Sequence, residues 1–156
     1  MFGRRTVLVA LVTAGLVVSG LAVASATPPS PTGFTSGVSG RGQAARSFEA
    51  HQRKGNDVAV NQITVPPAGF SGWHSHPGTT VVAVQSGQIT LFSEPIAGGE
   101  CRVRIFTAGQ VFLEHPSIKY NAVNTGSAPY VIAATFFNVP PNGGSSRIDQ
   151  TDPGNC

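Results

Sequence analysis

The sequence has few charged residues and few signs of long helices. Charged side chains make up only 11% of the 156 residues, whereas there are 19 glycines and 12 prolines. Glycine and proline interrupt helices, and no stretch after the N-terminal segment shows apolar residues at helical spacing. No internal repeat of roughly 20 to 50 residues is visible, so nothing indicates a solenoid. Length and composition together predict a single domain of short strands joined by many turns.

The N-terminal segment, residues 1–26, has the layout of a secretory signal peptide. Arg4 and Arg5 precede an apolar stretch over residues 7–24, which ends in small residues and is followed by three prolines. This layout predicts export, with cleavage after Ala26. An uncleaved membrane anchor is the alternative, because about 18 apolar residues can just span a bilayer. The arginine pair also leaves open the twin-arginine route, since the residues around it match that signal in part.

A basic surface for nucleic acid is lacking once the signal segment is removed. The whole chain has 10 Lys and Arg against 7 Asp and Glu, and loss of Arg4 and Arg5 leaves 8 against 7, a net charge of +1. Nucleic-acid binding depends on clustered positive charge, so we expect no nucleic-acid partner. A membrane partner is expected only if residues 1–26 stay attached.

Cysteine is also scarce, because Cys101 and Cys156 are the only two in the sequence. Two cysteines in an exported chain predict one disulfide between them, and two free thiols are the alternative. No cysteine lies at the expected cleavage point, which excludes a lipid anchor there.

The rest of the chain divides by composition into three segments. Residues 27–47 are rich in Pro, Ser, Thr and Gly and are expected to form a flexible leader. Residues 48–138 contain about eight short strand patterns at spacings of roughly ten residues, which is typical of a sandwich or closed barrel. Residues 139–156 form a tail rich in Pro and Gly.

The sharpest local motif is an H-x-H pair in the stretch Gly72–Gly78. Residues two apart in a strand project to the same face, so His74 and His76 are expected side by side. Imidazole is a good ligand for Zn, Cu, Fe and Ni, and the pair is therefore half of a metal site. The alternative is two polar residues on a solvated strand.

The segment around this pair resembles the first motif of the cupin superfamily. His74, His76 and Gly87 match its spacing, while Gly69 lies one residue short of the usual position. The second cupin motif is matched by Gly109, Pro116 and Asn124. The resemblance covers residues 58–137 and implies a single-domain, all-β cupin-type jelly-roll β-barrel. The stretch around His74 and the residues from Arg147 onward are also similar to small secreted cupin-domain proteins of actinobacteria.

Two ligand positions of the cupin motifs hold other residues here. The acidic ligand falls on Thr80, and the third histidine falls on Tyr120. Tyr120 could bind as a phenolate, which favours a hard or trivalent ion once its pKa is lowered. His115 is a further candidate ligand, with a solvated loop position as its alternative, and Glu114 could also substitute.

The resemblance implies a cavity inside the barrel and leaves three functions open. The expected cavity residues are Thr80, Val82, Phe92, Phe112 and Asn124. The alternative for Asn124 is a side chain that bonds to backbone in a turn. The first hypothesis is an exported protein that binds a small molecule and has a degenerate metal site at the two histidines. The others are a metal-dependent enzyme of dioxygenase or isomerase type and a structural domain of the cell envelope. The expected cofactor is one divalent or trivalent ion (Fe, Zn, Mn, Ni or Cu), or none. By analogy with the family, the chain could form a homodimer.

Overall fold

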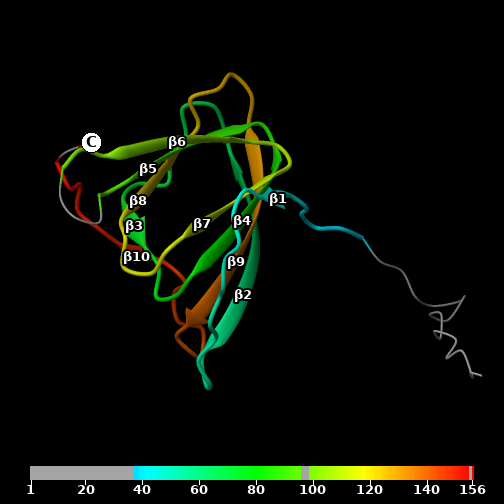
Figure 1. Cartoon of the computed structure of the whole chain (residues 1–156), viewed down its shortest axis with the longest axis vertical. Helices are drawn as coiled ribbons and strands as arrows, with labels where there is room; N and C mark the ends of the chain where they lie inside the picture. Colours follow the sequence, from blue (N-terminus) through cyan, green and yellow to red (C-terminus); the bar gives the residue numbers. More distant parts are fainter. Residues whose placement is uncertain (1–36, 96–98, 155) are drawn as a thin grey trace, which may run out of the picture. The chain divides into compact units, whose positions relative to one another are not determined.

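The fold is all-β in the computed structural model, which describes residues 37–95, 99–154 and 156 (Figure 1). These residues form ten strands and no helix. None of them therefore belongs to a helix long and apolar enough to cross a membrane. The expected signal segment, residues 1–26, and the first ten residues of the expected leader lie outside the described residues.

The strands form two sheets of five strands each. The first sheet has the order β1 (Gln43–Ala44), β7 (Gln110–Glu114), β4 (Thr80–Ser86), β9 (Tyr130–Val139) and β2 (Asp57–Val65). The second has the order β10 (Ile148–Asp149), β3 (His74–Ser75), β8 (Tyr120–Val123), β5 (Gln88–Ser93) and β6 (Arg102–Thr107). Within the described ranges no strand of one sheet pairs with a strand of the other, so the sheets are not closed into a barrel by strand pairing.

The inner faces of the two sheets build the hydrophobic core. Along β4 and β9 every second side chain is buried, as expected for strands with one face inward. Val84 and Ile132 are cross-strand partners in the first sheet, and Ile89 and Leu91 contribute from the second. Burying one such side chain stabilises the fold by about 1.5–3 kcal/mol.

The tight turn between β4 and β5 depends on Gly87, which joins the two sheets. Gly87 has a φ of 73°, in the left-handed region that favours glycine. A Cβ atom on Gly87 would lie 2.7 Å from the carbonyl oxygen of Pro129. Because β4 and β5 belong to different sheets, this turn carries the chain from one sheet to the other and does not close a hairpin.

Both ends of the described region pair with the sheets. β1 lies parallel to β7, and β10 lies antiparallel to β3, with Ile148 opposite Ser75 and Asp149 opposite His74. The predicted disulfide between Cys101 and Cys156 is confirmed. The segment that follows β9 is thereby held against the sheet that carries the histidine motif.

Candidate metal centre

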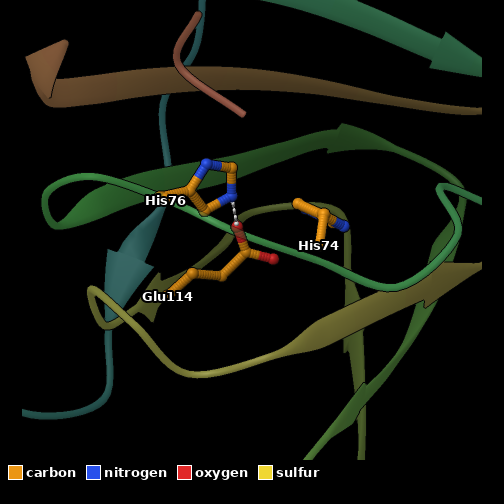
Figure 2. Close-up of side chains that lie close together, drawn as sticks. All are labelled: His74, His76 and Glu114. Carbon is orange, nitrogen blue, oxygen red and sulfur yellow. Dashed lines mark hydrogen bonds and ion pairs between the residues drawn. The ribbon is translucent and has the colours of Figure 1, made fainter. Parts of the chain in front are cut away.

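Three buried side chains, His74, His76 and Glu114, converge between the sheets (Figure 2). One potential ligand atom from each lies within 4.8 Å of those of the other two. The exposed fraction is 6% for His74, 4% for His76 and 5% for Glu114. Histidine nitrogens and a carboxylate oxygen at such spacing form a donor set that suits a transition-metal ion.

The strands bring these residues together from distant parts of the sequence. His74 lies in β3 opposite Tyr120 of β8, and His76 follows at the end of the same short strand. Glu114 is the last residue of β7, and its cross-strand partner on β4 is Thr80. Alternation along β7 puts Glu114 on the same buried face as Phe112. The carboxylate therefore points into the space between the sheets.

His74 is held as a neutral imidazole. Its Nδ1 donates a hydrogen bond to the carbonyl oxygen of Gly72 at 2.9 Å, which leaves Nε2 with a lone pair. Burial lowers the pKa of His74, and its neighbours His76 and Arg147 lower it further, against opposing effects of the Gly72 carbonyl and Glu114. A neutral imidazole is the form that binds metal ions.

His76 has a hydrogen-bond partner on each side of its ring. Its Nδ1 donates to the carbonyl oxygen of Ser146 at 2.6 Å. Its Nε2 lies 2.9 Å from Oε2 of Glu114 (Figure 2). With Nδ1 already the donor, a neutral His76 and an ionised Glu114 would face each other as two acceptors. The pair therefore needs either a proton or a metal ion between them.

The surroundings of the three side chains fit a bound ion. Both histidines donate Nδ1–H to backbone carbonyls, the arrangement that usually orients metal-ligating histidines. The hydroxyl of Thr80 is buried and has no hydrogen-bond partner among the described residues. An unpaired buried hydroxyl is costly, and a molecule bound in the cavity beside it would satisfy it.

A cavity of about 350 Å³ opens beside the three residues. Thr80, Val82 and Phe112, three of the residues expected there from the sequence, all line it.

Phe92 and Asn124, the other two expected residues, do not line this cavity. Phe92 is an even-numbered residue of β5, where Ile89 and Leu91 point into the core. The side chain of Asn124 bonds instead to backbone groups of Val65, Ala128 and Gly126.

Tyr120 and His115, the other ligand candidates from the sequence, face a second cavity. The hydroxyl of Tyr120 accepts a hydrogen bond from the backbone N–H of His115 at 2.9 Å. Burial raises the pKa of Tyr120, which favours the neutral phenol over the phenolate that a metal would need. The structure thus does not bring these two residues into the group formed by the two histidines.

Two contributors to the site lie in segments where the sequence analysis expected no chemistry. Ser146 and Arg147 of the tail both line the cavity, and Ser146 is the partner of His76. Nothing in the tail sequence indicates this role. Glu114, in contrast, was already a candidate ligand from the sequence, and it shares the parity of the apolar residue Phe112 in a short strand.

Comparisons with known proteins bear on the fold. No protein-family model and no curated protein matches the chain. An oxalate decarboxylase of Bacillus subtilis is similar in structure, at 20% identity and a TM-score of 0.51, over 60% of this chain and 24% of that chain. The chain has the cupin fold.

Two further structures are similar to this chain. An oxalate decarboxylase of Lactobacillus farciminis in complex with formate has 17% identity and a TM-score of 0.49, over 65% of this chain and 33% of that one. The CENP-C cupin domain of Drosophila melanogaster has 12% identity and a TM-score of 0.45, over 55% and 72%. The chain spans only about a quarter to a third of the length of the two oxalate decarboxylases.

The carboxylate of this group comes from another strand than the one that the resemblance to the first cupin motif implied. The position that resembles the acidic ligand of the first cupin motif is Thr80, which has no carboxylate. Its cross-strand partner is Glu114, so a carboxylate reaches the same region from the neighbouring strand. The resemblance to the cupin motifs gave two potential ligands, His74 and His76. The structure adds Glu114 as a third.

Proposed function

We propose that this protein is an exported cupin that binds one transition-metal ion through His74, His76 and Glu114 and holds a small molecule beside it. The convergence of these three donor groups carries the proposal. Two nitrogens and one carboxylate suit divalent iron, zinc, manganese, nickel or copper. Such an ion would supply a Lewis acid beside the cavity.

Export is proposed from two independent features. Residues 1–26 have the layout of a signal peptide. The disulfide between Cys101 and Cys156 is of a kind that persists mainly outside the cytoplasm. Similarity of the histidine segment to small secreted cupin-domain proteins agrees with both features.

Metal analysis of the tag-free protein tests the proposal. We expect about one ion per chain, and we expect Glu114→Gln and His76→Ala to lose it. The matched controls are Glu49→Gln and His51→Ala, because these two residues also pair with each other but are 84% and 85% exposed. Circular dichroism of each variant would show that the fold is kept. Stoichiometric metal in Glu114→Gln, or its absence from the wild-type protein after loading, would overturn the proposal.

A metal-dependent enzyme of dioxygenase or isomerase type is the second candidate, favoured by the number of protein ligands. Two histidines and one carboxylate are the ligand set of many iron oxygenases, which use the remaining positions for substrate and oxygen. Nitric oxide binding to the iron-loaded protein, followed by electron paramagnetic resonance, would test for such free positions. Failure of nitric oxide to bind would count against an oxygenase.

Binding without catalysis is supported by the rest of the cavity wall. Apart from the three proposed ligands, the titratable groups on the described wall are Tyr130 and Arg147. Burial raises the pKa of Tyr130 to about 12, so its hydroxyl stays protonated and cannot serve as a base at neutral pH. Acid–base chemistry would therefore depend on the metal and its ligands alone.

A further inference from the structure

Arg147 brings a positive charge to the wall of the cavity from the segment after β9. Its Nη2 atom lies 3.6 Å from the point that a Cβ atom on Gly72 would occupy. The carbonyl of Gly72 accepts the hydrogen bond from Nδ1 of His74. The guanidinium group therefore packs against the same stretch of backbone that orients the first histidine.

Only part of the hydrogen-bonding capacity of Arg147 is used. Its Nε donates to Oδ1 of Asp149 at 2.7 Å, and none of the hydrogen bonds among the described residues involves its terminal nitrogens. The side chain of Asp149 is 85% exposed, so solvent screens its charge. The side chain of Arg147 itself is 37% exposed, which leaves it accessible to a bound molecule.

The charges around the cavity leave an excess of positive charge. Apart from the histidines, the charged residues on the described wall are Glu114 and Arg147. The carboxylate of Glu114 already faces His76 at 2.9 Å and is committed to that pair or to an ion. A divalent ion would add two positive charges to the one on Arg147, whereas Glu114 and Asp149, the carboxylates in contact with these groups, carry two negative charges. One positive charge then remains without a partner. An excess of positive charge at the cavity wall favours a ligand of the opposite sign.

Most of the remaining wall is apolar, which restricts the rest of the ligand. Aliphatic and aromatic side chains from both sheets line it, among them Ile63, Val82, Ile89, Ile132 and Phe136. A cavity of about 350 Å³ has room for a small molecule. A fully polar ligand would leave these groups without apolar partners.

We infer that the cavity takes a small organic acid, whose carboxylate binds Arg147 and whose apolar body lies against the wall beside the metal ion. Arg147 is then the residue that selects an anionic ligand. The inference rests on the proposed function, because the acid binds in the cavity of the proposed metal centre. The segment after β9 then has a second role: besides orienting His76 through Ser146, it supplies the arginine that binds the acid.

Calorimetric titration of the zinc-loaded protein with hexanoate, hexanamide and acetate tests the inference. Hexanamide has the shape of hexanoate without its charge, and acetate has the charge without the apolar chain. We expect hexanoate to bind roughly tenfold or more tightly than either probe. Arg147→Gln should remove most of the preference over hexanamide, and Arg147→Lys should keep part of it. Arg104→Gln is the matched control, because Arg104 packs over Phe106 at 5.4 Å and lines the second cavity instead.

Equal affinity for hexanoate and hexanamide would overturn the inference while leaving the metal site intact. So would a preference for hexanoate that survives Arg147→Gln and disappears when zinc is removed, since the carboxylate would then bind the ion. If the protein binds no metal, the proposed function fails. The same probe pair on the metal-free protein then decides separately whether Arg147 selects the acid.

Discussion

Nε2 of His76 and Oε2 of Glu114 lie 2.9 Å apart, and their side chains are only 3% and 6% exposed. The other nitrogen of His76 is already a donor to Ser146, so the close contact with the carboxylate requires either a proton or an ion between the two atoms. Metal binding must displace that proton.

Metal binding should release about one proton from the pair formed by His76 and Glu114. Apparent affinity for zinc is therefore expected to rise with pH. Calorimetric titrations in buffers with different ionisation enthalpies would count the protons directly. A count of zero, or an affinity that does not change with pH, would show that the proton is not held between these two groups.

Thr80→Val is expected to stabilise the metal-free protein by about 1 kcal/mol. The hydroxyl of Thr80 is buried without a partner among the described residues, and valine replaces it with a methyl group of similar size. Thr90→Val is the matched control, because the hydroxyl of Thr90 is hydrogen-bonded to that of Thr125 at 2.8 Å. The control should be destabilised by about 1 kcal/mol in urea unfolding. An equal loss of unfolding free energy in both variants would contradict the statement that the Thr80 hydroxyl has no partner within the described part of the chain.

Removing the disulfide should weaken both the fold and the metal centre. The Cys101–Cys156 link closes a loop with a sequence separation of 55 residues, for which chain entropy gives about 4 kcal/mol. The link also holds the segment that carries Ser146, whose carbonyl orients His76. Replacing both cysteines with serine should therefore lower the denaturation midpoint and the zinc affinity together. Unchanged zinc affinity in a folded variant would show that β10 alone holds this segment in place.

His74 should make the stability of the metal-free protein depend on pH. Burial lowers its pKa below the ordinary value of 6.5, so the unfolded chain takes up the proton more readily. Its contribution to the free energy of unfolding is complete above about pH 6.5 and is lost as the pH falls towards the lowered pKa. His74→Gln should flatten the pH dependence over this range relative to the wild-type protein. An unchanged slope would contradict the lowered pKa.

The sequence was sufficient to predict the fold class and half of the metal centre. Alternating residues and glycine turns predicted an all-β protein, and the spacing of His74 and His76 predicted a shared face. The disulfide followed from the presence of only two cysteines. These features depend on local periodicity or on simple counting, which a single sequence contains. Export, cleavage after Ala26 and the homodimer remain predictions.

The other half of the site depends on register between strands, which the sequence does not display. Glu114 becomes a candidate ligand because β7 pairs with β4 so that it lies opposite Thr80. Ser146 and Arg147 reach the cavity because β10 pairs with β3. A sequence motif compares positions along the chain only. It therefore placed the missing ligands at Thr80 and Tyr120, and it did not show that Glu114 lies opposite Thr80 in the neighbouring strand.

The separation of the proposed ligands along the chain has a consequence for how an ion would enter the site. His76 lies 38 residues before Glu114 and 70 residues before Ser146, so no short fragment of the chain contains the set. An ion cannot nucleate folding here, because the pairing of distant strands must come first, and such pairing is slow. An ion at the proposed site would therefore bind the folded protein, and the free concentrations in its compartment would decide which ion occupies the site.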